Sequence, residues 1–395
     1  MEIDFDKVFR VMTFAMRVNR SHPDIARDKK WALQFISSHG IYFFMFCFLV
    51  YSIIFCDLKN NDFTQACSNG AICIVFIVVT FKYCVMLYYQ NLLKHMIQIM
   101  KRDYKSSCEL PLHEQKIVLH YALRGKGVVN VWLAISLCTA GLFPLKAIVL
   151  MVYYTIIGDF KFVLLYDLTY PVGLEEVKNE PGPFAILFFA FFFYDFYSML
   201  MYIAFAPLGP IFMLHVCGQL ELIKKRVLTI YPHNTTFDSE KVLKNFKDVI
   251  IKLQTIYSFV EDIKTCFKVS YELTLKATII ILPITFYMVI QSFKSGEVSL
   301  EFITIIIGAI TLSGIPCYYS DLLMETGESV RLAIYTSKWE MYWDRRVRCI
   351  LLVALVRTQR PIAVRSMFRP LCLDALTDVF HQSYAIFNVM NAAWN

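Results

Sequence analysis

The sequence predicts an all-α membrane protein with seven transmembrane helices, a cytosolic amino terminus, an extracellular carboxyl terminus and a cytosolic helical anchor region. Three observations predict it. Apolar residues make up 57% of the 395 residues and charged residues 18%, whereas soluble domains are about a quarter charged. The apolar residues gather in runs long enough to cross a bilayer, and Lys and Arg are concentrated in alternate connecting segments. Between these runs no segment is long enough for a soluble domain of normal size.

The transmembrane helices follow from run length, because a helix needs about 20 mostly apolar residues to cross the hydrocarbon. We expect seven spans, at residues 33–56, 70–90, 128–157, 183–214, 270–292, 299–320 and 371–392. The seventh is weak by hydropathy because it carries the polar residues Asp374, Asp378, His381, Gln382, Asn388 and Asn391. Such a helix is costly in lipid alone but stable when one side faces protein or water. The half-polar seventh helix therefore suggests that something passes along it.

The orientation follows from counting basic residues. The four segments predicted to lie inside hold 32 of the 39 Lys and Arg residues, and the three predicted to lie outside hold 4. Cytosolic loops carry such an excess, so the amino terminus should be cytosolic. Residues 1–30 are polar and charged, so we expect no cleavable signal peptide there.

Several inner segments should be helical. No Gly or Pro occurs from Ser239 to Leu282, and apolar residues recur there with a helical period. The fifth helix should therefore extend well below the membrane. The run from Arg345 to Arg360 is too short to span, and we expect a short cytosolic helix. The apolar faces of these helices either pack within one subunit or, as we favour, meet other subunits.

These spans divide the chain into six parts. They are a cytosolic amino-terminal segment (1–32), a ligand-pocket bundle (33–215), cytosolic anchor helices (216–269), helices five and six with their extension (270–344), a short cytosolic helix (345–370) and a pore helix (371–395).

Three charged residues fall inside predicted spans at similar depth: Lys82, Lys146 and Asp195. Charges in the hydrocarbon are costly, tend to pair and often mark a functional site. The simpler interpretation is an ion pair of Asp195 with one of the two lysines. The alternative is that a lysine lies in an aqueous pocket and meets the polar group of a ligand.

The outer halves of several spans are rich in aromatic residues and Met, which is typical of a pocket for a small apolar molecule but also of lipid-facing surfaces. The candidate ligand-binding residues are Phe76, Thr80, Tyr83, Lys146, Met151, Tyr154, Asp195, Tyr197, Met201 and Thr311. Motifs of hydrolases, nucleotide-binding enzymes and metalloproteases are absent from the sequence. We therefore expect no enzyme, no cofactor, no metal and no nucleic-acid partner.

Three passages resemble the insect odorant receptor family. They are LHVCGQLELI (Leu214 to Ile223), ESVRLAIYTSKW (Glu328 to Trp339) and, near the end, RTQRP (Arg357 to Pro361) followed by SYAIFNVM (Ser383 to Met390). Their order and spacing hold over the final 80 residues, and the general style is similar to moth receptors.

This resemblance implies a tetrameric cation channel with a central pore lined by the seventh helices. A volatile ligand would bind in the outer half of each subunit, in the plasma membrane of an olfactory dendrite. The functional complex would be a heterotetramer with the common co-receptor (Orco), and the compact 216–269 segment resembles that of a ligand-tuning subunit. The resemblance places Phe387, Met390 and Asn391 at the pore, whereas a helical wheel places Asp374, Asp378, His381 and Asn388 on the polar side. We keep Phe387, Asn388, Met390 and Asn391 as the candidate pore residues.

Two other classes remain open. A metabotropic seven-helix receptor would need an outside amino terminus, against which the distribution of Lys and Arg argues. A secondary transporter usually has internal repeats and broken helices; no repeat is visible, although Pro207 and Pro210 interrupt the fourth span.

Overall fold

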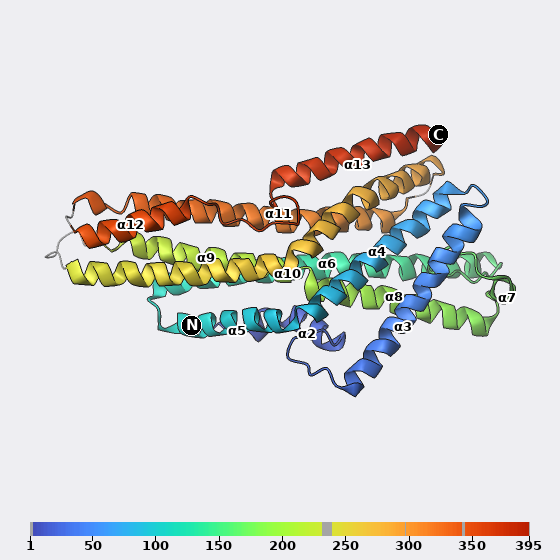
Figure 1. The fold of residues 1–395 in the computed structure, drawn as a ribbon. Coiled ribbons are helices and arrows are strands. Elements are labelled where there is room, and N and C mark those ends of the chain that lie inside the picture. Colours follow the sequence, from blue (N-terminus) through green and yellow to red (C-terminus); the bar gives the residue numbers. More distant parts are fainter. Residues whose placement is uncertain (1–2, 231–238, 297, 342–343, 395) are drawn as a thin grey trace.

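The computed structural model describes residues 3–230, 239–296, 298–341 and 344–394, which form an elongated helical bundle (Figure 1). Within these ranges there is no strand, only an isolated bridge between Arg365 and Pro370. The helices are α1 (Phe5–Val8), α2 (Arg10–Val18), α3 (Lys29–Tyr51, continued by a π-helix, Ser52–Asp57), α4 (Phe63–Tyr88), α5 (Gln90–Ser106), α6 (Leu112–Ile157), α7 (Val172–Glu175), α8 (Pro181–Phe205), α9 (Leu208–Leu228), α10 (Ser239–Lys294), α11 (Leu300–Tyr335), α12 (Arg345–Thr358) and α13 (Leu373–Trp394). Short 3₁₀ turns occupy Ser107–Glu109 and Trp339–Met341.

Local chemistry fixes several helix ends. The carboxylate of Asp28 accepts a hydrogen bond from the Trp31 amide at 2.7 Å and so caps the start of α3. Asp62 caps α4 in the same way, through the Gln65 amide at 3.0 Å. Gly158, with φ of 86°, ends α6 in the left-handed conformation that glycine adopts without strain.

Helices occupy all seven predicted spans, with one difference. The fourth span, expected as one helix over 183–214, is divided into α8 and α9 at Pro207, which has no amide hydrogen to continue the helical ladder. Six helical segments within the described ranges are long and apolar enough to cross a membrane. α13 is not among them, but its 22 residues reach about 33 Å, enough to cross the hydrocarbon.

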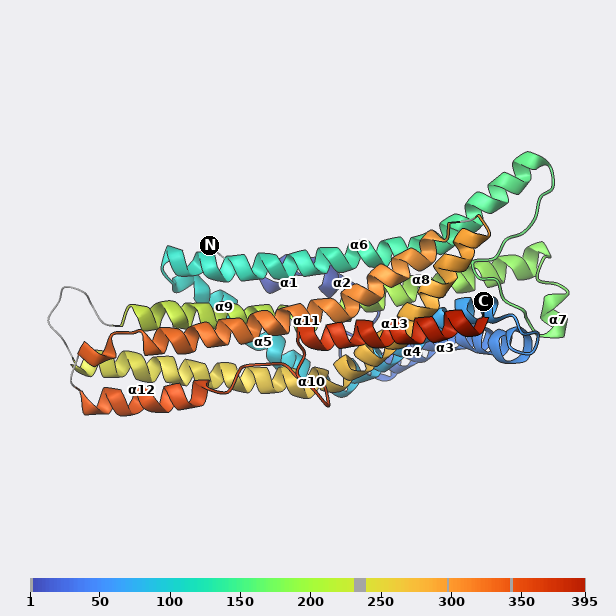
Figure 2. The ribbon, with the colours of Figure 1, turned by 90° about the horizontal axis from the view of Figure 1, so that it is seen from above.

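Three helices are much longer than a bilayer is thick. α6 has 46 residues, α10 has 56 and α11 has 36, so they extend about 69, 84 and 54 Å at 1.5 Å per residue. The fifth predicted helix therefore does continue beyond the hydrocarbon, as its lack of Gly and Pro indicated. α12 runs beside the extensions of α10 and α11 at one end of the molecule, which we call the α12 end (Figures 1 and 2).

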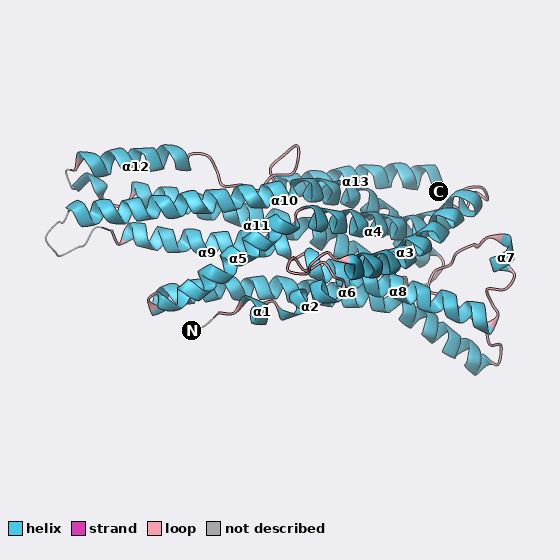
Figure 3. Cartoon of the chain, turned by 60° about the horizontal axis from the view of Figure 1, so that its bottom comes forward, coloured by secondary structure: helices cyan, strands magenta, loops and turns pink. Residues whose placement is uncertain are grey.

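The opposite end carries α7 and is called the α7 end. Figure 3 shows the loop that bears α7 there. The α3–α4 turn and the α10–α11 turn reach the same end (Figure 1). The three loops predicted to lie outside the cell are thus gathered at one end, as any membrane topology with these spans requires.

Among the described residues, two large apolar clusters and a small third one, formed by Val128, Trp132 and Leu214, make up the core. One large cluster fills the half toward the α12 end and joins α1, α2, α5, α9 and the extensions of α10 and α11. The other large cluster fills the half toward the α7 end, between α3, α4, α8 and the remaining parts of α10 and α11. The candidate site lies in the second half.

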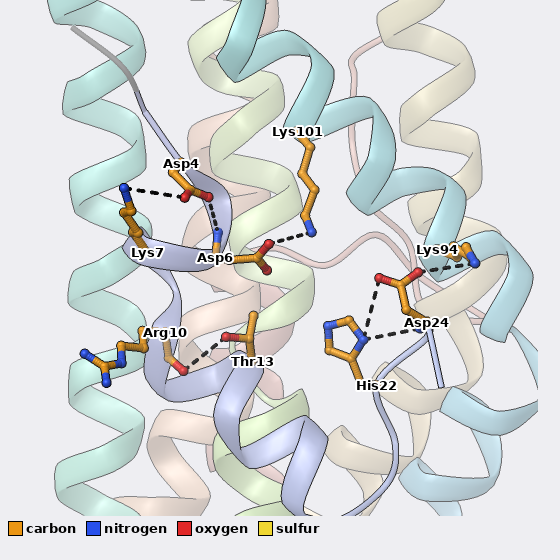
Figure 4. A network of polar contacts seen from close by, with 9 residues as sticks. All are labelled: Asp4, Asp6, Lys7, Arg10, Thr13, His22, Asp24, Lys94 and Lys101. Carbon is orange, nitrogen blue, oxygen red and sulfur yellow. Dashed lines mark hydrogen bonds and ion pairs between the residues drawn. The ribbon is translucent and has the colours of Figure 1, made fainter. Parts of the chain in front are cut away.

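The amino-terminal segment is held against the bundle by ion pairs to α5 (Figure 4). Lys101 Nζ lies 2.8 Å from an oxygen of Asp6, and Lys94 Nζ lies 3.3 Å from an oxygen of Asp24. His22 is buried beside Asp24, whose amide donates to His22 Nδ1 at 3.2 Å. Burial lowers the pKa of His22, and the Asp24 carboxylate partly opposes this.

The segment also makes buried contacts with the transmembrane helices. Asn19 donates from Nδ2 to the Met201 sulfur at 3.1 Å, and its carbonyl accepts from the Tyr83 hydroxyl at 3.0 Å. Phe9 packs so closely on Gly125 of α6 that a Cβ there would lie 3.1 Å from its ring. Residues before α3 are therefore part of the core of the molecule.

Candidate ligand-binding site and pore helix

A cavity opens between α4, α6, α8, α10 and α11, in the half toward the α7 end. The empty volume between its walls is about 870 Å³, including the part open to the surroundings, and about 100 Å³ of it can hold the centre of a water-sized sphere. Its walls are mostly apolar, with few polar groups, as in sites for small molecules. The polar and aromatic side chains that line it are Trp132, Ser136, Thr139, Phe143, Tyr166, Tyr194, Asp195, Ser198, Tyr202 and Thr278.

Helical periodicity explains why α8 contributes so much. Tyr194, Asp195, Ser198, Met199 and Tyr202 all line the cavity. Their spacing of three to four residues puts them on one face of a helix. One face of α8 thus supplies a row of hydroxyls and rings with one carboxyl group among them.

Asp195 carries the carboxyl group of the cavity and is 7% exposed. The Tyr166 hydroxyl, from the loop between α6 and α7, donates a hydrogen bond to Asp195 Oδ1. Asp195 Oδ2 is buried and has no hydrogen-bond partner among the described residues. The indole Nε1 of Trp132 is likewise buried without a partner in these ranges. Both atoms are groups for which a bound ligand can provide a partner.

The expected ion pair of Asp195 with Lys146 or Lys82 is wrong. Lys146 pairs instead with Glu301 on α11, at 2.5 Å between Nζ and Oε1. Lys82 is 3% exposed, with Nζ 4.7 Å from the centre of the Phe205 ring, and the described residues place no carboxylate within ion-pair distance of it. Sequence depth alone did not reveal that the three side chains point to different sides of the bundle.

Asp195 is the predicted ligand-binding residue that lines the cavity; the other nine lie elsewhere. Four of these pack behind α4 and α8, toward α3 and the amino-terminal segment: Phe76, Tyr83, Tyr197 and Met201. Phe76 stacks on Phe46 at 4.0 Å between ring centres. Tyr83 and Tyr197 line a second hollow beside Asn19 and Phe35, with about 110 Å³ open to the centre of a water-sized sphere.

The remaining candidates are dispersed. Thr80 Oγ1 is buried without a hydrogen-bond partner in the described ranges, outside the cavity. Thr311 Oγ1 donates to the Ile307 carbonyl of its own helix at 2.7 Å. Met151 and Tyr154 lie near the end of α6, where Lys161 Nζ sits 5.5 Å from the Tyr154 ring centre. These residues do not form one site with Asp195.

Several lining residues were missed by sequence reasoning. Tyr194, Ser198 and Tyr202 could have been found, because they share the helical face of Asp195. Trp132 and Tyr166 could not, since their places depend on how α6 and the following loop fold over α8.

α13 packs on α10 and α11 and has two distinct faces. Phe387 and Met390 are partly buried against the apolar cluster of the α7 half. Asn388 lies on the exposed face with Tyr384 and His381. Asn391 is half-buried. The structure thus separates the pore residues implied by the family resemblance from most of the polar stripe.

Polar contacts fix the beginning of α13. Arg369 Nη1 lies 2.8 Å from Asp378 Oδ2, and the Leu373 amide donates to Asp321 Oδ2 of α11 at 2.8 Å. Asp378 therefore has a basic partner, Arg369, within the subunit, whereas Asn388 is exposed on the surface of the subunit. No cluster of His, Cys, Asp or Glu suited to a metal occurs in the part of the chain that the structure describes.

The fold and the cavity define a multi-pass helical membrane protein with an internal cavity whose walls are mostly apolar. A model of the 7tm odorant receptor family matches residues 62–384, and the chain belongs to this family. It is a family of receptors, not of enzymes.

Solved structures agree with this assignment at the level of the fold. The insect olfactory receptor OR5 from Machilis hrabei in complex with eugenol superposes with a TM-score of 0.74 at 12% identity, covering 98% of this chain and 100% of that one. A second structure of OR5 from Machilis hrabei superposes with a TM-score of 0.73 at 13% identity, covering 98% of this chain and 96% of that one. The search of curated proteins finds no match.

Proposed function

We propose that this protein is the ligand-binding subunit of an odorant-gated, nonselective cation channel that forms a heterotetramer with the odorant receptor co-receptor. The observation that carries the proposal is the cavity between α4, α6, α8, α10 and α11, whose apolar walls and few polar groups suit a small volatile molecule. We propose that the ligand is a volatile molecule that reaches the cavity from outside the cell or from the lipid. Membrane lipid surrounds the helical bundle.

The proposed orientation places the α7 end outside the cell and the α12 end in the cytosol of a sensory dendrite, in the plasma membrane. The bias of Lys and Arg supports it. The cavity then lies in the outer half of the membrane, and the extensions of α6, α10 and α11 form a cytosolic anchor with α12.

Gating requires that ligand binds the open arrangement better than the closed one. α10 and α11 both line the cavity and both pack on α13. A ligand that draws these two helices together therefore changes the surface on which α13 rests. We propose that α13 moves outward in response and widens a pore formed by four subunits.

The direct test is to express the chain with and without the co-receptor and record currents across a panel of volatile compounds. Ligand-evoked cation currents that require both subunits are expected. Normal surface expression of both without any evoked current across a broad panel would contradict the channel proposal.

An epitope tag at residue 1 separates the channel from a metabotropic receptor. On unpermeabilised cells we expect no labelling of this tag and labelling of a tag after residue 395. The reverse pattern would exclude the proposed orientation and would favour the metabotropic class.

A further inference from the structure

The ligand cavity contains an acidic group that the protein leaves only half satisfied. Asp195 Oδ1 accepts from the Tyr166 hydroxyl, but Oδ2 is buried without a partner among the described residues. A buried polar atom without a hydrogen bond is costly. A ligand that donates a hydrogen bond to Oδ2 removes this cost, whereas a hydrocarbon leaves it.

The absence of a nearby cationic side chain indicates which kind of ligand would donate a hydrogen bond to Asp195. No Lys, Arg or His is among the residues that line the cavity. Lys146, the predicted counter-charge, is held by Glu301 at 2.5 Å, and Lys82 lies over the Phe205 ring. The described part of the protein therefore places no cationic side chain next to this carboxyl group. A cationic ligand would provide the missing positive charge.

The rings of the cavity favour the same kind of ligand. Trp132, Phe143, Tyr166, Tyr194 and Tyr202 line it together with Asp195. Aromatic faces attract ammonium groups through the ring quadrupole, and this attraction is stronger where water is excluded. A carboxyl group among aromatic rings is a combination suited to an amine with an apolar body.

We propose that the cavity takes small apolar amines in their protonated form, with the ammonium group against Asp195 Oδ2 and the hydrocarbon part against the aliphatic walls from α4 and α11. This inference rests on the proposed function, because it names the ligand class of the same site. It goes further in that it assigns one polar contact and one charge to the ligand.

Binding to the full-length protein in lipid nanodiscs tests the proposal directly, by thermal stabilisation or by quenching of tryptophan fluorescence. The probes are benzylamine, benzyl alcohol and toluene, which share the ring and differ in the polar group. Wild-type protein should bind benzylamine about tenfold or more tightly than toluene, as expected for a hydrogen bond to a charged group.

Asp195→Asn keeps the size of the side chain and removes the ionisable carboxyl group. It should weaken benzylamine binding about tenfold or more and leave toluene binding within about threefold. The matched control is Asp167→Asn, which removes the same group from an exposed position next to Tyr166 in the sequence. It should change neither affinity.

Tyr166→Phe is a second variant that keeps the test decisive if Asp195→Asn folds poorly. It frees Oδ1 as well, so benzylamine binding should be kept or strengthened, and a clear loss of benzylamine binding in folded Tyr166→Phe would overturn the proposal. Equal binding of benzylamine and toluene by the wild type, or unchanged benzylamine binding by folded Asp195→Asn, would overturn the proposal. The proposal would also be overturned if Asp195→Asn lost affinity for benzyl alcohol and for benzylamine to the same extent, because a neutral hydrogen-bond donor would then bind as well as a charged one.

Failure of the proposed function has a different signature. If benzylamine binds and Asp195→Asn abolishes binding, but no current appears in cells that express both subunits, the channel assignment fails and the ligand class stands. If other volatiles evoke currents but amines neither bind nor act, the channel stands and the amine proposal fails.

Discussion

Single side chains decide how closely the helices of this bundle approach each other, and Gly209 is the clearest case. A Cβ at Gly209 would lie 1.8 Å from the hydroxyl oxygen of Tyr271, on α10. That hydroxyl is buried and has no hydrogen-bond partner among the described residues. The close contact of α9 and α10 therefore depends on the missing side chain at position 209.

Gly209→Ala should lower the free energy of unfolding by about 1–3 kcal/mol, because overpacking forces helices apart. Thermal unfolding in detergent measures the change. Tyr271→Phe removes the clashing oxygen and should restore most of the loss in the double variant. Gly70→Ala, where no atom lies within 4 Å of the added Cβ, serves as the control and should not destabilise the protein. A double variant as unstable as Gly209→Ala would show that the hydroxyl is not the obstacle.

At the scale of elements, the two faces of α13 lead to different expectations for permeation. Phe387 is partly buried against the bundle, whereas Asn388 is exposed. If the exposed face meets the ion path, a carboxylate at position 388 attracts cations there.

Asn388→Asp should therefore increase divalent over monovalent cation permeability of the assembled channel, measured from reversal potentials. Phe387→Ala should act mainly on stability and basal leak, through lost packing against the bundle. A selectivity change in Phe387→Ala and none in Asn388→Asp, at equal surface expression, would place the opposite face of α13 in the pore.

The amino-terminal segment should respond to acid. His22 has a pKa below its usual value because it is buried, so the folded state binds its proton less readily than the unfolded state. Stability is then complete above the unfolded pKa and falls as the pH drops through the folded one. Asp24, Asp6, Arg17 and Lys101 are the charges that act on it.

Thermal unfolding between about pH 5 and 7.5 should show the wild type losing stability toward acid by a few degrees more than His22→Gln. The carboxylates titrate in both proteins and so cancel in the comparison. Parallel curves for the two proteins would mean that His22 takes up its proton in the folded state without cost.

Among the elements, those with a strong local signal were predictable from the sequence. The uninterrupted run from Ser239 gave α10, and the arginine-flanked apolar run gave α12, because both depend on periodicity and on helix breakers. In the sequence, Pro207 indicated an interruption of the fourth span, but it did not show that the span is two separate helices, α8 and α9.

The site was less predictable, because hydropathy gives the depth of a residue and not its direction around the helix. Lys82, Lys146 and Asp195 were expected to meet at one depth, yet they face Phe205, Glu301 and Tyr166. The partners Glu301 and Tyr166 come from a distant helix and a loop, and neither position follows from local pattern.

At the scale of the whole molecule, the anchor exposes apolar side chains that a single subunit does not cover. On α12, Leu352, Val353 and Val356 are 55%, 67% and 65% exposed. Such surfaces are typical of protein interfaces, in agreement with the proposed heterotetramer.

Leu352→Gln with Val356→Gln should reduce co-purification with the co-receptor several-fold while the thermal stability of the isolated subunit stays unchanged, because neither side chain is buried in the monomer. Leu112→Gln, at an exposed position at the start of α6, is the control and should leave co-purification intact. Undiminished assembly of the α12 variant would exclude this surface as the interface.

The cavity obtains one of its walls from outside the helices, since Tyr166 belongs to the connection between α6 and α7. Connections of this kind tolerate replacement far better than packed helices do. The chemical preference of the receptor can therefore change through this short stretch alone, while the helices proposed to conduct ions keep their sequence. This separation lets the range of bound molecules change without any change in the helical bundle.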